Sequence, residues 1–156
     1  MNEYQKLGKN FTLKEFTRSQ IARRNNIDNT PNKEQIENLK ELVKNLLQPL
    51  RNRIDCPITV TSGYRSFRVN YLAGGSRNSQ HMEGKAADID VTCMPLENLF
   101  RIIVEEFDYD QLIYEFGEWI HISWNGQKNR KSTLIAVFEH GETKYRKYKQ
   151  GNDKIQ

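Results

Sequence analysis

The sequence predicts a single α+β domain in which a central, mainly antiparallel sheet is flanked by helices. Patterns typical of helices come early in the chain, whereas strand patterns come mostly late. Most of the predicted strands are joined by links of hairpin length, which favours antiparallel pairing because parallel strands need longer crossovers. A chain of 156 residues is the usual size of one domain with one core, and we take 1–156 as that domain.

The first predicted element is a short helix near the N-terminus. Residues 1–10 are polar, and we expect them to be frayed, as we do 149–156 at the other end. The residues 12–15 match a capping box, in which a threonine and a glutamate hydrogen-bond to the first turn of a helix. Phe11 and Phe16 flank this box and are predicted to anchor the helix in the core.

The longest predicted helix follows a polar stretch at 18–29, to which we assign no element. Thr30 is the expected cap, and Pro31 takes the first helical position. Apolar residues then recur at helical spacing, namely Ile36, Leu39, Val43, Leu46, Leu47 and Leu50. Pro49 lacks a backbone N–H and is expected to kink or end the helix, and 55–57 form a turn.

The remaining chain is predicted to be rich in strands, at 58–62, 86–91, 111–116, 119–124, 134–138 and 143–148. Pro95 opens one helix between the second and third of them. Residues 66–80 are polar and contain two adjacent glycines, so we predict a loop there, a usual place for substrate contacts. The last two strands should form a hairpin that turns at His140 and Gly141.

Three residues have the type and setting of metal ligands. A lone histidine such as His81, in a polar and glycine-flanked segment, would most often be exposed and idle. Asp88, however, lies inside an apolar strand, where an unpaired carboxylate is costly. His121 lies in another strand between two isoleucines. Three such residues in one domain favour a metal site, and catalytic Zn²⁺ usually takes three protein ligands. We therefore predict one Zn²⁺.

Glu118 precedes His121 by three residues and is the predicted general base. Zinc lowers the pKa of water toward neutrality, and a nearby carboxylate can accept the proton. Residues three apart on an unbroken strand point to opposite faces, so Glu118 has to lie just before the regular strand. Gly117 supplies the backbone freedom for that. An exposed carboxylate beside a turn is the alternative, and it stays open.

Arg65 is a candidate for the stabilisation of negative charge. It follows a predicted strand, and a guanidinium near a metal would stabilise the oxyanion that forms when a carbonyl is attacked. A surface arginine is the alternative, and spacing alone does not decide between them. Tyr64 and Ser79 are candidate substrate-binding residues.

Two cysteines, Cys56 and Cys93, make no disulfide framework, and we expect two free, partly buried thiols. No apolar run has the length of a membrane span, and the start of the chain lacks the apolar stretch of a secretory signal. We expect a protein made in the cytoplasm that leaves the cell by another route, or never leaves, or has been trimmed.

The net charge of +4 favours polyanionic surfaces, although ordinary surface charge explains most of it. No motif for specific nucleic-acid binding is present, so no such partner is expected. The basic residues near the C-terminus, Lys144, Arg146, Lys147, Lys149 and Lys154, would suit an anionic cell-wall polymer. A charged edge strand that resists aggregation is the alternative.

The pattern Ser-x-His-x-x-Gly-x-Ala-x-Asp at 79–88, followed by Glu-x-x-His at 118–121, resembles the zinc D-alanyl-D-alanine carboxypeptidases. Their relatives include D-Ala-D-Ala dipeptidases, phage endolysin peptidases and the Hedgehog signalling domain. Further segments resemble the subfamily often found in phages and prophages, namely 11–16, 29–31, 48–51 and 62–66. The resemblance covers about residues 10–125 and implies the Hedgehog/DD-peptidase fold.

This resemblance also implies roles for residues. His81, Asp88 and His121 would hold zinc, Glu118 would be the general base, and Arg65 would polarise the scissile carbonyl. The implied reaction is hydrolysis of peptidoglycan stem peptides at a D-alanine-containing bond, so the protein would act on the bacterial cell wall. Separately, we expect a monomer. The alternatives are an endolysin endopeptidase that cuts another stem or cross-link bond, and an inactive zinc-containing module that binds cell wall. Residues after about 126 match no signature, and their role is open.

Overall fold

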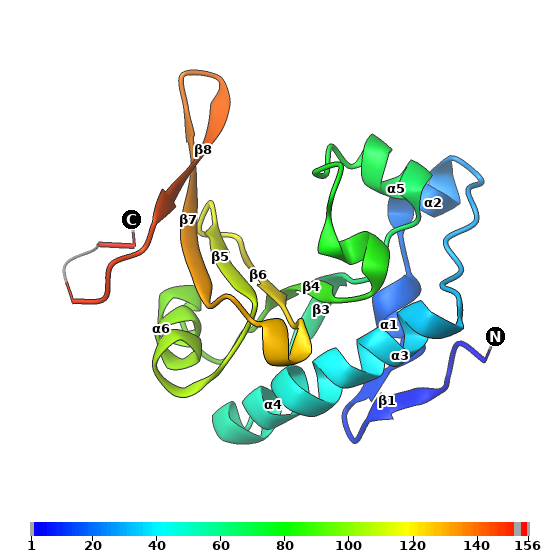
Figure 1. Cartoon of the computed structure of the whole chain (residues 1–156), viewed down its shortest axis with the longest axis horizontal. Helices are drawn as coiled ribbons and strands as arrows, with labels where there is room; N and C mark the ends of the chain where they lie inside the picture. The colour runs from blue at the N-terminus through cyan, green and yellow to red at the C-terminus, as the bar shows by residue number, and fades with distance from the viewer. Residues whose placement is uncertain (1, 152–153, 156) are drawn as a thin grey trace.

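The computed structural model describes residues 2–151 and 154–155. Its centre is a six-stranded sheet with the strand order β3-β4-β6-β5-β7-β8 (Figure 1). The strands are β3 (Thr59–Ser62), β4 (Ala86–Asp90), β5 (Gln111–Glu115), β6 (Trp119–Ser123), β7 (Ser132–Glu139) and β8 (Glu142–Lys147). The β5–β7 pair is parallel, and the other neighbours in this sheet are antiparallel. The predicted α+β domain with a mainly antiparallel sheet is confirmed.

The N-terminal segment is more ordered than we expected. Strand β1 (Lys6–Gly8) pairs with β2 (Phe11–Thr12), and α1 (Leu13–Thr17) follows. The predicted capping box is present, since the Thr12 backbone N–H donates to the Glu15 carboxylate over 2.7 Å. The expectation of fraying at 1–10 is wrong for the strand, because buried Leu7 anchors it in the core. Residue 1 lies outside the described residues.

The long helix is an almost continuous rod made of α3 (Lys33–Leu42), a π-helical turn η1 (Val43–Leu47) and α4 (Gln48–Ile54). It begins at Lys33 with Asn32 as its cap, later than predicted, because the Asn32 and Gln35 side chains each accept a hydrogen bond from the other's backbone N–H. Pro49 does not end the rod. It comes just after η1, where the Gln48 backbone N–H donates to the Val43 carbonyl oxygen five residues back, so the proline comes where the hydrogen-bond pattern of the rod already changes.

Two short helices lie where we predicted none. They are α2 (Gln20–Arg24) in the polar stretch and α5 (Phe67–Leu72) in the expected loop 66–80. Ser19 caps α2 by accepting from the Ala22 backbone N–H over 3.2 Å. Each helix buries at most two residues, so neither produces an apolar stripe long enough to be recognised in the sequence.

The sheet has one face against helices and one face toward the candidate site. Helix α6 (Leu96–Glu106) begins directly after Pro95, as predicted, and lies on the same side of the sheet as the α3–α4 rod (Figure 1). The residues that face these helices are apolar and buried, among them Ala87, Ile89, Leu112, Ile120, Ile122 and Ile135. The segment with α5 lies on the opposite side of the sheet.

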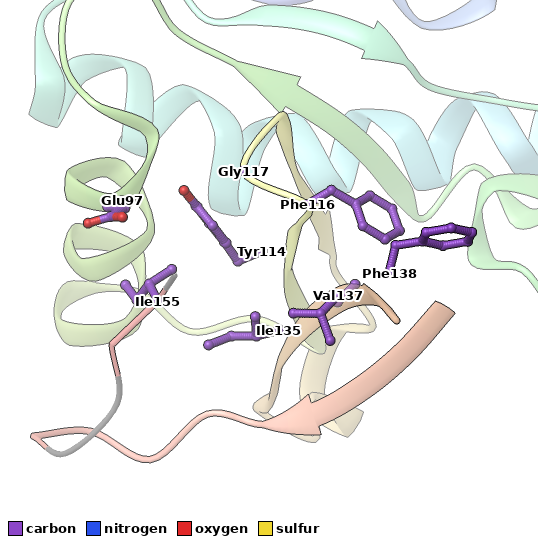
Figure 2. Close-up of a pocket in the computed structure, with 9 residues that line it drawn as sticks. Glu97, Tyr114, Phe116, Gly117, Ile135, Val137, Phe138 and Ile155 are labelled. Carbon is purple, nitrogen blue, oxygen red and sulfur yellow. The ribbon is translucent and has the colours of Figure 1, made fainter. Parts of the chain in front are cut away.

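The C-terminal segment also returns to the core. The hairpin turns at His140 and Gly141 as predicted. The Tyr148 ring then packs edge-on against Phe100, with 5.2 Å between centroids. Ile155 is 3% exposed and lies beside α6, where it lines one hollow together with Glu97 of α6 and Ile135 of β7 (Figure 2). The expectation of fraying at 149–156 is therefore wrong for Ile155, whereas 152–153 and 156 lie outside the described residues.

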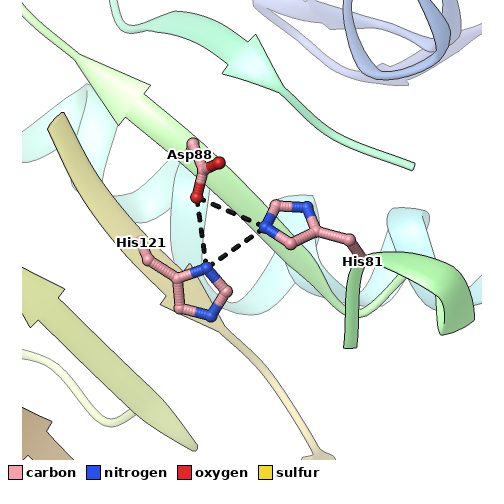
Figure 3. Close-up of side chains that lie close together, drawn as sticks. All are labelled: His81, Asp88 and His121. Atoms are coloured by element: carbon pink, nitrogen blue, oxygen red, sulfur yellow. Dashed lines mark hydrogen bonds and ion pairs between the residues drawn. The ribbon is translucent and has the colours of Figure 1, made fainter. Parts of the chain in front are cut away.

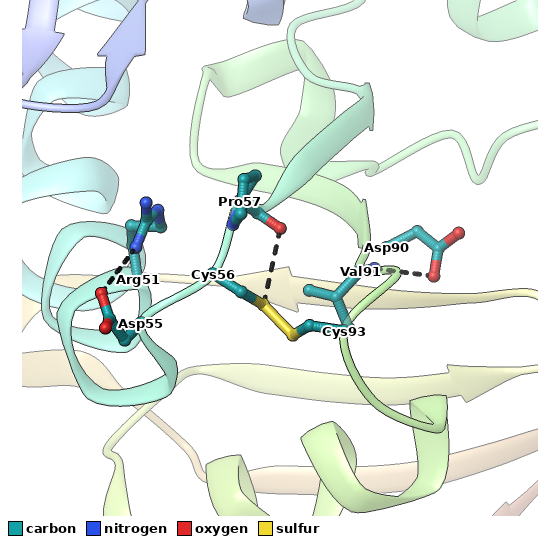
Figure 4. The surroundings of a disulfide bond; sticks show 7 residues. All are labelled: Arg51, Asp55, Cys56, Pro57, Asp90, Val91 and Cys93. Carbon is teal, nitrogen blue, oxygen red and sulfur yellow. Dashed lines mark hydrogen bonds and ion pairs between the residues drawn. A yellow bond between two sulfur atoms is a disulfide. The ribbon is translucent and has the colours of Figure 1, made fainter.

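Cys56 and Cys93 form a disulfide with 6.4 Å between their Cα atoms (Figure 4). The expectation of free thiols is wrong, and the strand register gives the reason. Thr59 of β3 pairs with Asp90 of β4 in antiparallel fashion. Cys56 comes three residues before Thr59, and Cys93 comes three residues after Asp90. Because the two strands are antiparallel, both cysteines lie at the same end of the strand pair and face each other. No helix in the described part of the chain is long and apolar enough to cross a membrane.

Candidate metal centre

Three side chains from separate segments meet on the open face of the sheet (Figure 3). Nε2 of His81 lies 3.2 Å from Nδ1 of His121 and 3.3 Å from Oδ1 of Asp88. The distance from His121 Nδ1 to Asp88 Oδ1 is 3.1 Å. His81 and Asp88 are buried, and the His121 side chain is 11% exposed. The structure thus brings together the three residues that the sequence predicts as metal ligands.

Strand register places two of the three. Asp88 of β4 is paired directly with His121 of β6. Because directly opposed residues in a sheet have their side chains on the same face, the carboxylate and the imidazole must lie side by side. The neighbours of Asp88 in β4, Ala87 and Ile89, point the other way into the core. Alternation along β4 therefore separates the Asp88 carboxylate from the apolar residues of the core.

His81 comes from the short 3₁₀ turn η2 (Gln80–Glu83), which lies against α3. Gly84 ends this turn with a φ of 72°, and a Cβ there would collide with the Gln35 backbone. Gln35 also donates from Nε2 to the Met82 carbonyl oxygen over 2.9 Å. The glycine of the sequence motif is therefore needed for the approach to α3 that holds His81 in place.

The hydrogen bonding of His81 fixes which nitrogen faces the other ligands. Nδ1 of His81 lies 2.6 Å from the Gly63 carbonyl oxygen. A carbonyl only accepts, so Nδ1 carries the proton and the Nε2 lone pair points toward Asp88 and His121. Metal-binding histidines commonly donate their second N–H to a carbonyl in this way.

The spacing of the three atoms fits zinc. Ligand atoms at 2.0–2.1 Å from a tetrahedral ion are about 3.3–3.4 Å apart. The three distances here run from 3.1 to 3.3 Å. Two imidazole nitrogens and one carboxylate oxygen are also a donor set that zinc takes in catalytic sites. The residues therefore fit one zinc ion in both chemistry and spacing.

The electrostatics of the cluster favour the protonation states that a metal needs. Burial lowers the pKa of the His81 imidazole and so favours its neutral form. Burial would raise the pKa of the Asp88 carboxyl, but the attraction and hydrogen bonds of the two histidines outweigh this and hold that pKa well below its usual range. A neutral imidazole and an ionised carboxylate are the ligand forms.

Arg65 lies against the cluster and not in bulk solvent. Its Nη2 donates to Asp88 Oδ2 over 2.9 Å, and its Nε donates to Ser62 Oγ over 2.9 Å. The side chain is 17% exposed. Arg65 thus occupies one oxygen of Asp88 and leaves Oδ1 to face the two histidines.

The two glutamates of the β5–β6 hairpin have different surroundings. Glu118, the predicted base, is exposed in the turn, and its backbone N–H donates to the Glu115 carbonyl oxygen over 2.9 Å. Among the described residues that line the cavity around the triad is Glu115 but not Glu118. The pKa of the Glu115 carboxyl is raised to about 6, mainly by burial. The charge of Asp88 raises this pKa further, whereas the charges of His121 and Arg65 lower it.

Only one of the two predicted substrate-binding residues reaches this cavity. Ser79 lines it and also accepts from the His81 backbone N–H over 3.3 Å. Tyr64 is 7% exposed and belongs to the core, so its prediction as a substrate contact is not supported.

The part of the chain after residue 126 forms one wall of the cavity, a role that the sequence left open. Thr143 and Tyr145 of β8 line it together with Arg130. The fully buried Asp110 holds this wall to the η2 turn, because its carboxylate accepts from Arg130 Nη2 over 2.7 Å and from Gln80 Nε2 over 2.9 Å. The alternation of β8 puts Tyr145 on one face, but nothing in the sequence identifies that face as the site face.

Comparisons with known proteins agree with this geometry. Residues 9–123 match the sequence model of a family described as Peptidase M15. A stretch of 44 residues is 50% identical to the zinc D-Ala-D-Ala carboxypeptidase of Streptomyces albus G. That stretch is 28% of this chain, and it spans 17% of the length of the Streptomyces protein. The triad of His81, Asp88 and His121 falls within the family match.

Proposed function

The chain belongs to the Peptidase M15 family, and from this premise we propose that it is a zinc-dependent peptidase of the bacterial cell wall. Its proposed substrate is a peptidoglycan stem peptide, cut at a D-alanine-containing bond in the manner of the carboxypeptidase that it partly matches. The observation that carries the proposal is the spacing of three donor atoms, which corresponds to one face of a zinc tetrahedron. We propose that a monomer is the active form.

His81 through Nε2, His121 through Nδ1 and Asp88 through Oδ1 would hold one zinc ion. When bound, zinc lowers the pKa of water and withdraws electrons from a carbonyl oxygen. A site with three protein ligands has a position left for water or substrate, as catalytic zinc sites do and closed structural sites do not. This supports an enzyme over an inactive module that only binds cell wall.

Arg65 would act twice in this site. Its bond to Asp88 Oδ2 orients the carboxylate so that Oδ1 faces the metal position. Its guanidinium also lines the cavity, where its positive charge would stabilise the negative charge that develops on the scissile carbonyl oxygen. The first role depends on the planar fork of arginine, which a lysine lacks, and the fork also fixes where the charge of the second role lies.

The base for this reaction is proposed to come from the β5–β6 hairpin. The family resemblance assigns it to Glu118, the residue of the Glu-x-x-His motif. Glu118 lies in the exposed turn of that hairpin, so the assignment needs a test of its own.

The experiment is digestion by the zinc-loaded protein of a synthetic peptide that ends in D-Ala-D-Ala and, separately, of purified peptidoglycan, with the products identified by mass spectrometry. We expect free D-alanine from the peptide and no product from metal-stripped protein. Cleavage of peptidoglycan without release of D-alanine would reassign the protein as an endopeptidase. No product from either substrate, with one zinc bound per chain, would contradict the proposed function.

A further inference from the structure

The register of the β5–β6 hairpin puts Glu115 on the same face of the sheet as the metal ligands. Glu115 is the last residue of β5 and pairs directly with Trp119 of β6. Two residues further along each strand, Ile113 pairs with His121, which in turn pairs with Asp88. Paired residues share a face, and so do residues two apart on one strand. The side chains of Glu115, His121 and Asp88 therefore project from one face.

Glu118 is placed differently by the turn. Phe116 has a φ of 57° and Gly117 a φ of 73°, and the Glu118 backbone N–H closes the turn onto the Glu115 carbonyl oxygen. Two left-handed residues closed in this way make the tight turn of a hairpin, with Glu118 at its exposed end. The freedom that Gly117 was expected to supply is used to reverse the chain and not to direct Glu118 at the metal position.

Burial and charge also separate the two glutamates. Glu115 is half-buried and lines the cavity with Arg65, His81, Asp88 and His121. The charges of His121, Asp88 and Arg65 all act on its carboxyl group. The Tyr145 hydroxyl across the cavity is in turn influenced by the charges of both Glu115 and Asp88. Glu115 thus belongs to the electrostatic environment of the triad.

We propose that Glu115, and not Glu118, is the general base of the peptidase reaction. The proposal deepens the proposed function and rests on it. Glu115 accepts a proton from the attacking water as the water oxygen forms its bond to the scissile carbonyl carbon. The C–N bond then breaks, and Glu115 returns that proton to the departing amine. One water is consumed, and the products are a carboxylic acid and an amine, which settle as a carboxylate and an ammonium once the acid proton passes to the amine. Glu115 ends in its initial ionised state.

A half-buried carboxylate suits this task better than an exposed one. Proton transfer is efficient when the base is neither too weak nor already protonated at working pH, and partial burial makes a carboxylate a stronger base. Glu115 also comes from a regular strand, whereas Glu118 comes from a turn. A group on a strand is held more firmly in position for proton transfer.

The test compares Glu115→Gln with Glu118→Gln, and uses Glu142→Gln as a matched control on the exposed end of the β7–β8 hairpin. Three quantities are measured for each zinc-loaded variant: zinc affinity by competition with a chelator, turnover of the stem peptide that wild type cuts, and affinity for acetohydroxamic acid by calorimetry. The last needs no turnover, because the hydroxamic acid binds a metal after giving its proton to a base.

We expect Glu115→Gln to keep zinc affinity within about threefold of wild type and to lose roughly 10²- to 10⁴-fold in turnover, the usual contribution of a general base. Acetohydroxamic acid should bind it at least about tenfold more weakly, because the proton acceptor is gone. Glu118→Gln and Glu142→Gln should stay within about threefold of wild type in all three measurements, since neither removes a proton acceptor from the cavity. Glu115→Asp, which keeps a carboxylate, should fall between wild type and Glu115→Gln.

The assignment is overturned if Glu118→Gln loses turnover while Glu115→Gln keeps it, or if Glu115→Gln loses zinc. It is also overturned if Glu115→Asp is no better than Glu115→Gln when both melt at the wild-type temperature. Should Glu115→Gln fail to fold, the comparison of Glu115→Asp with Glu118→Gln decides. If wild type binds zinc but cuts no stem peptide, the proposed function fails, and the hydroxamic acid arm still tests whether Glu115 accepts a proton in this cavity.

Discussion

The two faces of the central sheet differ in chemistry, although the same strands build both. On the site face, Asp88, Glu115 and His121 gather beside a polar cavity. On the other face, Tyr114 and Ile135 border an apolar hollow between α6 and the C-terminal segment (Figure 2). Among the described residues that line this hollow, the one carboxylate is Glu97, which comes from α6 and not from a strand.

The difference teaches that position along a strand is not enough to assign a role. Side chains alternate between faces, so one step along β5, from Tyr114 to Glu115, leads from core packing to the candidate site. Glu118 is close to His121 in sequence but lies in the turn, whereas Glu115 is farther away in sequence and lies on the right face. The predictions below test whether the two faces can be changed independently.

The largest expected effect comes from His121→Ala on the site face. Removal of one of three ligands should abolish tight zinc binding and lower turnover by about 10³-fold or more, because the several kcal/mol that the metal supplies are lost. Zinc content by elemental analysis and peptide hydrolysis measure this. Circular dichroism should show a folded chain, because the fold does not depend on that side chain. Normal activity at full zinc content would rule out His121 as a ligand.

Ile120→Ala, at the residue next to His121, should lower stability and leave zinc binding unchanged. Ile120 is fully buried on the core face, and loss of its side chain leaves a cavity. The free energy of unfolding should fall by about 2–5 kcal/mol, measured by urea denaturation. Zinc affinity of the folded protein should stay within a few-fold of wild type. If zinc binding fell as far as it does in His121→Ala, the two faces would not be separable.

The disulfide links β3 and β4 outside the sheet and should contribute to stability without affecting chemistry. The double substitution of Cys56 and Cys93 by serine opens a link across a sequence separation of 37. The free energy of unfolding should fall by roughly 2–4 kcal/mol, because the unfolded chain gains freedom. Zinc affinity and turnover of the folded variant should not change. Equal denaturation midpoints for the variant and oxidised wild type would show that the link contributes nothing.

Arg65→Lys should have a smaller effect, and on turnover more than on stability. Lysine keeps the charge but cannot bridge Ser62 and Asp88 as the guanidinium does. Turnover should fall about 10- to 100-fold with zinc still bound. Arg53→Lys is the matched control, because Arg53 pairs with the Glu106 carboxylate at the surface and is not among the described residues that line the cavity. A similar loss in both variants would point to a general effect and not to the site.

The smallest effect is expected from charge removal in the basic C-terminal strand. Lys144 pairs with Val137, and Lys147 pairs with Leu134, so the two lysines stand on opposite faces of β8. Their charges are screened over about 8 Å at physiological salt. Sedimentation with purified cell walls should differ less than about twofold between wild type and a Lys144/Lys147/Lys149 to glutamine variant. A large difference that fades with salt would instead support binding of an anionic polymer by this strand.

The sequence predicts best where a local signal is strong. The capping box of Thr12, the start of α6 after Pro95, and the turn at Gly141 need only nearby residues, and all are confirmed. The three metal-ligand candidates were also found, because a carboxylate and an imidazole inside apolar strands need partners and their strands pair directly. The polar residue inside an apolar strand is visible in the sequence, whereas the direct pairing of Asp88 with His121 is seen only in the structure.

The sequence predicts worst where long-range contacts decide. Cys56 and Cys93 face each other only because of the β3–β4 register, which no local pattern reveals. Helix α5 is too short to show an apolar stripe. Tyr145 belongs to the site wall because β7 pairs in parallel with β5, an arrangement that hairpin-length links do not suggest. The different surroundings of Glu115 and Glu118 likewise follow from the tight turn at Phe116 and Gly117, which no local pattern specifies.

The central claim, that His81, Asp88 and His121 form a zinc site, is tested most directly by anomalous diffraction at the zinc edge from crystals of zinc-loaded protein. The account predicts one strong peak per chain, about 2.0–2.2 Å from Nε2 of His81, Nδ1 of His121 and Oδ1 of Asp88. No peak among these three side chains, or a peak held by other residues, would contradict the account and remove the basis for the proposed peptidase.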